Sequence, residues 1–546
     1  MICSEMKEPN VLYGPLPSAF SNHANESLST LMYAKLKQHG TKVSQIDGVT
    51  GKQQTFKDIL NSSCLLASSL KSRGLIPGDV LSICCENRLE FTIPVVAALY
   101  IGVVCAPINP SYTTDEIVHA LTISKPKIIF CSARVLASIC EAVRKCKFVS
   151  EIVLFDENEE SMPFKVTFYS KLLESAPQAS DASVFEPMKF DSRHQTAVVL
   201  CSSGTTGLPK GVMLSHANLE AFVGAGGNTR QLNLSAKDTI MGLVPFFHGY
   251  GYGMILNCML LGPKCVILPK FEENLFLSTI EKYKVTVLPM VPPLMVFLAK
   301  HPLVDKFDMS SVRNVFVGAA PCSLDTINAV SRRLKLKGVR QAYGMTELSI
   351  AITVSSMDSN NPLTVGKLVA GAEGKVVDLE TGKNVGPNVV GELCFRGPHI
   401  MQGYYDNPNA TANIIDKNGW LHTGDIGYYD EQENFYIVDR LKELIKYKGY
   451  QVAPAELEGV ILTHPGVKDA AVIGIPDESS GELPKAFVVK QPGAKIVEKD
   501  IVDYVKGKVS SQKRLRGGVE FVSAIPRNPS GKVLRRILRD GIKSKL

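Results

Sequence analysis

The stretch Val198-Val199-Leu200-Cys201-Ser202-Ser203-Gly204-Thr205-Thr206-Gly207-Leu208-Pro209-Lys210-Gly211 runs from a buried-strand pattern into a turn rich in glycine and hydroxyl groups. The glycines let the chain curl so that backbone N–H groups converge, and the hydroxyls add donors. A lysine at the end supplies a charge for polyphosphate oxygens. The stretch therefore predicts a phosphate-binding loop. Its expected contacts are Ser202, Ser203, Gly204, Thr205, Thr206, Gly207 and Lys210.

The spacing of this loop excludes a Walker A motif. That motif requires a glycine, four residues, and then Gly-Lys followed by Ser or Thr. Counting from Gly204, Pro209 replaces the second glycine and Gly211 replaces the hydroxyl residue. A solvated turn is the simpler interpretation of a Ser/Thr/Gly cluster. The motifs that follow along the chain favour the phosphate-binding interpretation.

Size and composition indicate a globular protein of more than one domain. A chain of 546 residues exceeds one ordinary domain, so we expect a large core and at least one further unit. The thirteen cysteines are scattered without a C-x-x-C pair, which favours free thiols in a reducing compartment. The N-terminus lacks the basic start and apolar run of a secretory signal.

No membrane span and no nucleic-acid partner are predicted. Residues 91–111 carry no charge, but Pro94, Gly102 and Pro107 interrupt them, which favours a buried helix followed by a buried strand. Residues 501–546 hold twelve Lys and Arg against three acidic residues, yet almost no aromatic residues for base stacking. Small polyanionic ligands explain this charge equally well.

The C-terminal tripeptide Ser544-Lys545-Leu546 matches the address that the peroxisomal import receptor reads. We therefore expect peroxisomal localisation, with a solvated basic tail as the simpler alternative. We expect the protein to be a monomer.

The apolar runs predict an α/β fold. Val80–Cys84, Lys127–Cys131 and Ile152–Phe155 are short and separated by helical patterns, which is typical of parallel strands. Lys375–Asp378 and Gly391–Gly397, with a turn signal at Gly382 between them, predict antiparallel strands of a smaller subdomain.

The phosphate loop, together with Tyr343-Gly344-Met345-Thr346-Glu347, Trp420-Leu421-His422-Thr423-Gly424-Asp425 and Pro526–Lys532, resembles the motifs of adenylate-forming enzymes. This superfamily includes acyl-CoA synthetases, 4-coumarate:CoA ligases and beetle luciferases, and the resemblance covers nearly the whole chain. It implies a large N-terminal α/β domain with parallel-type sheets and a small β-rich subdomain, residues 1–440. It also implies a small mobile α+β lid, residues 441–546.

The resemblance implies that a carboxylate attacks the α-phosphate of ATP and that coenzyme A then takes the acyl group. Charge neutralisation by Mg²⁺ and lysines is needed before two anions can react. Glu347 matches the Mg²⁺ ligand, and a carboxylate suits this hard cation. Thr346 matches a phosphate contact, Asp425 the ribose carboxylate, and Arg440 its partner. Singly, each of these residues would more often be a helix-start or turn residue.

The remaining site residues follow from the same resemblance. Small residues after the apolar strand Val315-Phe316-Val317 match the adenine site, and a mobile Lys532 matches the lysine that stabilises charge in the adenylation transition state. Lys446 and Gln451 match residues used after the lid rotates, and Lys448-Gly449 match the pantetheine channel. The expected nucleotide contacts at these strands are Gly318, Ala319, Ala320, Pro321, Gln341, Tyr343 and Gly344.

The segment Pro245–Met254 is aromatic and rich in glycine, so we interpret it as one wall of the acyl pocket, where His248 either gates the pocket or orients the carboxylate. A structural histidine is the simpler alternative. Relative to luciferases, this chain has Phe222 in place of an arginine and Ile350 in place of a serine. Both changes remove hydrogen bonds from a phenolic substrate and favour an aliphatic chain.

The favoured function is therefore a fatty acyl-CoA synthetase. The alternatives are luciferin oxygenation, an aryl-CoA ligase of the coumarate type, and a non-enzymatic protein. Lys210, Glu347, Asp425 and Lys532 together argue against a decayed site.

Overall fold

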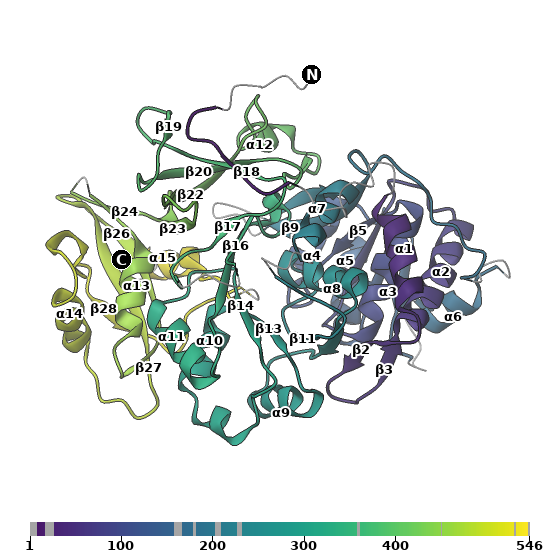
Figure 1. The fold of residues 1–546 in the computed structure, drawn as a ribbon, viewed down its shortest axis with the longest axis horizontal. Coiled ribbons are helices and arrows are strands. Elements are labelled where there is room, and N and C mark those ends of the chain that lie inside the picture. The colour runs from purple at the N-terminus through teal and green to yellow at the C-terminus, as the bar shows by residue number, and fades with distance from the viewer. Residues whose placement is uncertain are drawn as a thin grey trace.

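The computed structural model describes residues 8–16, 27–157, 166–177, 182–202, 209–226, 232–356, 361–448, 450–528 and 531–543. Within these ranges the chain forms four sheets (Figure 1). The predicted α/β fold class, with its β-rich subdomain and C-terminal domain, is confirmed. That the C-terminal domain is mobile stays a prediction.

The eight-stranded sheet carries the phosphate-loop strand. Its order is β21 (Gly403–Tyr404), β10 (Lys210–Ser215), β9 (Thr196–Ser202), β5 (Val104–Pro107), β4 (Val80–Cys84), β6 (Ile128–Cys131), β7 (Glu151–Leu154) and β8 (Val166–Phe168). β4 through β7 are buried along their whole length and pair in parallel, as their apolar sequences predicted. β10 returns antiparallel to β9 and places Lys210 opposite Ser202.

The nine-stranded sheet carries the predicted adenine segment. Its order is β17 (Lys367–Leu368), β16 (Thr353–Val354), β15 (Arg340–Tyr343), β14 (Asn314–Val317), β13 (Val287–Met290), β11 (Thr239–Gly242), β12 (Lys264–Ile267), β2 (Val43–Asp47) and β3 (Gln53–Thr55). β13, β14 and β15 pair in parallel. Their carboxyl ends therefore lie at one edge of the sheet, where α/β proteins bind ligands.

Helices cover these two sheets. The N-terminal ones are α1 (Leu28–His39), α2 (Phe56–Ser72), α3 (Thr92–Ile101), α4 (Thr114–Ser124), α5 (Leu136–Lys145), α6 (Tyr169–Glu174), α7 (His216–Gly226), α8 (Gly249–Leu261), α9 (Glu273–Tyr283), α10 (Pro292–Lys300), α11 (Leu324–Arg333) and α12 (Pro408–Ala412). α2 and α4 each begin with a capping box, in which a threonine hydroxyl and an acidic side chain satisfy free backbone N–H groups.

The main core joins α1, α2, α3 and α8 to strands of both large sheets through one cluster of buried apolar side chains. Every residue of α3 is buried, and the buried strand β5 follows it, as predicted for residues 91–111. In the part of the chain that the structure describes, no helix has the length and apolar character needed to cross a membrane. Each cysteine described there is a free thiol.

The six-stranded sheet is the predicted β-rich subdomain, drawn at the top of Figure 1. It contains β1 (Leu12–Tyr13), β18 (Glu373–Val377), β19 (Asn384–Val385), β20 (Gly391–Arg396), β22 (Leu421–Tyr429) and β23 (Phe435–Arg440). All its pairings are antiparallel, and Asp425 lies opposite Arg440 on the neighbouring strands β22 and β23.

The five-stranded C-terminal sheet lies at the left of Figure 1, beside α10 and α11. It contains β24 (Ile445–Tyr447), β25 (Tyr450–Val452), β26 (Val467–Asp477), β27 (Gly481–Lys490) and β28 (Val519–Phe521), with α13 (Pro454–Leu462), α14 (Glu498–Lys506) and α15 (Arg535–Lys543). β23 of the six-stranded sheet ends at Arg440, and β24 of the C-terminal sheet begins at Ile445. The domain boundary after residue 440 stays a prediction.

Candidate active site

A cleft of about 1060 Å³ lies between the N-terminal part of the chain and the C-terminal domain. Its floor is formed where β14 and β15 end, and β22 and β23 contribute one side. The predicted residues that line it are Ala319, Ala320, Pro321, Gln341, Tyr343, Gly344, Asp425, Arg440 and Lys532. The cleft therefore brings together segments that are far apart in the sequence. Gly318 directly follows β14 and precedes Ala319.

Each carboxylate oxygen of Asp425 has its own partner, and the two contacts hold the side chain in one orientation. It is buried, and its Oδ1 lies 3.0 Å from Nε of Arg440, its partner across the β22–β23 ladder. The hydroxyl of Tyr343 donates to Oδ2 at 2.6 Å. Burial, and then the negative charge of Asp425, raise the pKa of Tyr343 well above its usual value, so this hydroxyl stays a donor. The arrangement presents a fixed carboxylate to the cleft.

Lys532 reaches the cleft from the C-terminal domain. Its backbone N–H donates to Oδ1 of Asn528 at 2.8 Å, which closes the turn before it. Gly531 has a φ of +83°, and a Cβ atom there would lie 3.3 Å from Cβ of Val291. The glycine turn thus packs closely on the N-terminal part of the chain. Desolvation, and then the charge of Arg440, lower the pKa of the Lys532 ammonium to about 8.

His248 is the N-cap of α8. Its Nδ1 accepts a hydrogen bond from the backbone N–H of Tyr250 at 3.3 Å. Desolvation, and then the nearby charge of Lys532, lower the pKa of His248 to about 4. The imidazole is therefore neutral near pH 7. Because Nδ1 accepts, we assign the ring proton to Nε2, which makes this atom a donor.

Lys210 and Glu347 are linked by a tyrosine that the sequence analysis missed. The ammonium of Lys210 lies 4.7 Å from the centre of the Tyr404 ring, and the hydroxyl of Tyr404 donates to Oε1 of Glu347 at 2.8 Å. Glu347 is buried, and its carboxylate keeps capacity for further partners. A buried carboxylate beside a lysine suits a hard cation and phosphate oxygens. Nothing in the local sequence around Tyr404 signals this contact, because β21 and the short helix at Thr346–Leu348 are distant in the chain.

Some predicted residues lie outside the described ranges or outside the cleft. Ser203, Gly204, Thr205, Thr206, Gly207, Gly449, Ser544, Lys545 and Leu546 are not among the described residues. Thr346 begins the short helix that holds Glu347. Lys446 and Gln451 are cross-strand partners on β24 and β25; both are exposed, as is Lys448, and none of the three lines the cleft.

A second contact between the two parts of the chain was also missed. The ammonium of Lys300, at the end of α10, lies 3.4 Å from the carbonyl oxygens of both Leu462 and Val467 in the C-terminal domain. Leu462 ends α13, and a cation near a helix C-terminus is favourable. Lys300 therefore helps to hold the C-terminal domain in the orientation that brings Lys532 to the cleft.

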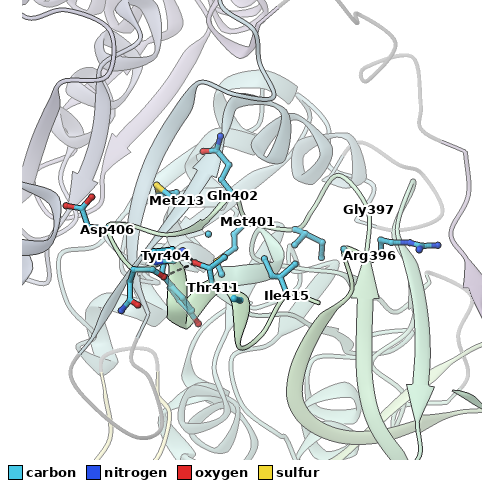
Figure 2. Close-up of a pocket in the computed structure, with 15 residues that line it drawn as sticks. Met213, Arg396, Gly397, Met401, Gln402, Tyr404, Asp406, Thr411 and Ile415 are labelled. Carbon is cyan, nitrogen blue, oxygen red and sulfur yellow. Dashed lines mark hydrogen bonds between the residues drawn. The ribbon is translucent and has the colours of Figure 1, made fainter. Parts of the chain in front are cut away.

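Tyr404 also borders a second cleft, of about 830 Å³, on β21 and α12 (Figure 2). Its backbone N–H donates to Oγ1 of Thr411 at 2.9 Å, which ties β21 to α12. Met213 and Met401 line the same cleft. The backbone of Tyr404 is thus fixed on the side of this second cleft, while its hydroxyl bonds Glu347.

Comparisons with known proteins agree with this geometry. The model of a family described as AMP-binding enzyme matches residues 33–405, and that of the AMP-binding enzyme C-terminal domain matches residues 456–532. A luciferin 4-monooxygenase from Nipponoluciola cruciata is 42% identical over 543 residues, which cover 98% of each chain. A 4-coumarate-CoA ligase 1 from Narcissus pseudonarcissus is 39% identical over 94% of this chain and 93% of its own. The structure of ATP-bound MatB from Rhodopseudomonas palustris superimposes with a TM-score of 0.84 at 27% identity, over 95% of this chain and 99% of that one.

Proposed function

The chain belongs to the AMP-binding enzyme family, and from this premise we propose that it is an AMP-forming acid–thiol ligase for a medium- or long-chain fatty acid. In the first step an oxygen of the fatty acid carboxylate attacks the α-phosphorus of ATP, and pyrophosphate leaves with the electrons of the broken P–O bond. In the second, the thiol sulfur of coenzyme A attacks the acyl carbon. The thiol proton is lost and AMP leaves, which gives the thioester.

The nucleotide is bound by groups that the fold holds rigid. Asp425 accepts hydrogen bonds from the ribose hydroxyls, and Tyr343 and Arg440 keep its carboxylate in place. Small residues at the end of β14 leave room for the flat adenine ring. Lys210 lies beside the polyphosphate, where its charge offsets that of the phosphate oxygens.

Two groups contact the reacting carboxylate, of which one is a cation and the other is neutral. Lys532, as a cation, stabilises the negative charge that builds between carboxylate and α-phosphate in the transition state. The neutral His248 donates from Nε2 and orients the carboxylate without adding a charge. Glu347, with its unused oxygen capacity, is the residue that would hold Mg²⁺, whose charge offsets that of the phosphates.

The proposed choice of a fatty acid rests on the packing of Phe222 and Ile350. A Cβ atom added at Gly253 of α8 would lie 2.5 Å from Cε1 of Phe222 and 2.7 Å from Cδ1 of Ile350. These two apolar side chains therefore meet against the helix that His248 caps. Because neither can hydrogen-bond a phenol, this wall favours an aliphatic acid over an aryl one.

Ile350 is also held in an unusual backbone conformation. Its φ is +82°, which is costly for a β-branched residue, and its neighbour Ser349 is also left-handed. The hydroxyl of Ser349 donates to the carbonyl of His399 at 2.7 Å, which fixes this turn. The conformation directs the Ile350 side chain toward α8, where it supports the apolar wall.

The second step is assigned to the other face of the C-terminal domain. The side chains of Lys446 and Gln451 are exposed and do not line the cleft, so a rotation of that domain is needed to bring them to the adenylate. Coenzyme A, the monomeric state and peroxisomal localisation through Ser544-Lys545-Leu546 belong to the same proposal.

Pyrophosphate release across a panel of acids tests the proposal. We expect release with fatty acids, formation of the acyl-CoA after coenzyme A is added, and no light with luciferin. Bright emission with luciferin would make the chain a luciferin 4-monooxygenase, and turnover of coumarate alone would make it an aryl-CoA ligase. Silence with every acid would favour a non-enzymatic protein.

The variant Ile350→Ser probes the wall directly. It should lower kcat/KM for a fatty acid and raise it for a hydroxylated aryl acid, by about 10-fold each, since one missing apolar contact is worth roughly 1–3 kcal/mol. Leu363→Ser, at an exposed leucine that lines the proposed nucleotide cleft and not the wall of Phe222 and Ile350, is the control and should leave this ratio unchanged.

A further inference from the structure

The side chains of Glu392, Cys394 and His422 converge on one face of the six-stranded sheet. Cys394 on β20 is the cross-strand partner of His422 on β22, and Glu392 is two residues before Cys394 on the same strand. The pairing of β20 with β22 shifts register between Glu392 and Cys394, so the ladder is irregular at this place. One ligand atom from each lies within 4.8 Å of the others. The adenylation chemistry uses none of these residues.

The distances between these atoms approach those of a tetrahedral zinc site. Sγ of Cys394 lies 3.4 Å from Nδ1 of His422, and Nδ1 lies 2.8 Å from Oε2 of Glu392. In a tetrahedral site, Zn²⁺ bonds are about 2.3 Å to sulfur and about 2.1 Å to nitrogen or oxygen. The sulfur then lies about 3.6 Å from the nitrogen, and the nitrogen lies about 3.4 Å from the oxygen. The thiol–imidazole distance needs almost no change. The distance between Nδ1 of His422 and Oε2 of Glu392 has to increase by about half an ångström.

The other polar atoms of the cluster already have partners. Oε1 of Glu392 accepts from the backbone N–H of Gly424 at 2.9 Å, which leaves Oε2 directed at the cluster. Nε2 of His422 faces Oδ2 of Asp416 at 3.7 Å. Oδ1 of Asp416 accepts from the backbone N–H groups of Asn418 and Trp420, so this carboxylate is fixed. A carboxylate behind the far nitrogen of a histidine is the usual support of a metal ligand.

The surroundings leave one side of the cluster open. The side chains of His422 and Glu392 are 35% and 16% exposed, whereas Cys394 is fully buried. Lys375 on β18 is the strand partner of Cys394, and its ammonium lies 4.4 Å from the centre of the Trp420 ring. The guanidinium of Arg396 lies 4.4 Å from the same ring and pairs with Glu373. Both cations thus have aromatic or acidic partners of their own.

We propose that Glu392, Cys394 and His422 bind one thiophilic divalent cation of the Zn²⁺ class, with water as the fourth ligand and Asp416 as the support of His422. A buried thiolate excludes Mg²⁺ and Ca²⁺, which require oxygen ligands. The site is separate from Glu347 and independent of the proposed acid substrate. It fixes β22 just before Asp425, so its first effect is on the stability of the six-stranded sheet.

Cadmium binding to the full chain, freed of metal and without nucleotide, tests this site. Cd²⁺ takes the same ligands, and its bond to a thiolate absorbs in the ultraviolet, which identifies the sulfur. We expect one equivalent to bind with this absorption, and Zn²⁺ to displace it. Cys394→Ser should abolish the absorption and His422→Gln should weaken binding, while Cys146→Ser, a buried thiol remote from this sheet, should behave as the wild type.

Thermal unfolding gives a second readout. A cation that binds only the folded chain raises Tm, so Cd²⁺ should raise the Tm of the wild type and of Cys146→Ser but not of Cys394→Ser. If Cys394→Ser does not fold, a variant of the partly exposed Asp416 is used as the test. Asp416→Asn should weaken Cd²⁺ binding about 10- to 100-fold. Absence of Cd²⁺ binding, thiolate absorption that persists in Cys394→Ser, or unchanged affinity in Asp416→Asn would overturn the proposal.

Discussion

The hydroxyl of Tyr343 donates a hydrogen bond of 2.6 Å to Oδ2 of Asp425, whose other oxygen is paired with Arg440. The tyrosine ends β15 of the nine-stranded sheet, and the aspartate lies on β22 of the six-stranded sheet. This contact therefore joins the two sheets at the place where the nucleotide is proposed to bind.

Removing this donor should weaken nucleotide use. In Tyr343→Phe a buried carboxylate loses a hydrogen bond worth about 1.5–3 kcal/mol, so kcat/KM for ATP should fall about 10- to 100-fold. Most of the loss should lie in KM, because the ribose contact is made in both ground and transition states. Steady-state pyrophosphate release measures both constants. Tyr436→Phe, whose hydroxyl bonds Asp430 away from the cleft, is the control.

Variants of Lys532 and Lys446 in the C-terminal domain should each impair only one of the two half-reactions. Lys532→Ala removes a charge that acts in the adenylation transition state, so acyl-adenylate formation should fall at least about 100-fold while thiolysis of supplied acyl-adenylate continues. Lys446→Ala should do the reverse. Each step is measured alone, by pyrophosphate release and by acyl-CoA formation. Equal loss of both steps in either variant contradicts the division of labour.

The pH profile of adenylation should report Lys532. Its pKa in the folded protein is lowered to about 8, so the active ammonium form is complete below this value and is lost as pH rises through it. kcat/KM for ATP, which reports the free enzyme, should therefore fall above about pH 8. In Lys532→Arg the guanidinium stays charged, so the remaining activity should show no such fall. A wild-type profile that stays flat to pH 10 would contradict this assignment.

Lys300 should favour the orientation of the C-terminal domain that supports adenylation. Its ammonium contacts two carbonyl oxygens of that domain at 3.4 Å, an exposed contact worth about 0.3–1 kcal/mol. Lys300→Met should slow adenylation about two- to five-fold and leave thiolysis unchanged or faster. Lys306→Met, an exposed lysine on the neighbouring short helix, should change neither rate. Single-turnover assays of the two steps compare the variants.

Local patterns predicted much of this fold. The strands β4, β6 and β7 are mainly apolar and are buried over their whole length, and the helix and strand within residues 91–111 are set by hydrophobic runs and interrupting prolines. Their structure depends mainly on neighbours in sequence, so the pattern suffices. The order of motifs likewise placed Asp425, Tyr343 and Lys532 in one site before any contact was known.

Other features depend on contacts that no local pattern records. The glycine-rich sequence Gly249–Gly253 gave no prediction of a helix, yet the segment forms the start of α8, because packing in the core outweighs the low helix propensity of glycine. Tyr404 and Lys300 act through partners on distant elements, so their sequence surroundings carry no signal. The cross-strand approach of Cys394 to His422 is set by the register of β20 and β22.

The pairing of Asp425 with Arg440 bears on how the enzyme avoids wasting its intermediate. Arg440 is the last residue of β23, and the C-terminal sheet begins at Ile445, so any turn of that domain takes place just beyond a residue already anchored to the ribose carboxylate. Asp425 and Arg440, which are proposed to hold the nucleotide, therefore lie on the N-terminal side of the point about which the C-terminal domain would rotate. In the proposed rotation of the C-terminal domain, the acyl-adenylate, a mixed anhydride that water readily cleaves, would stay bound through its AMP half while Lys532 moves away and the thiol arrives. Little of this intermediate would then be lost to water between the two proposed steps.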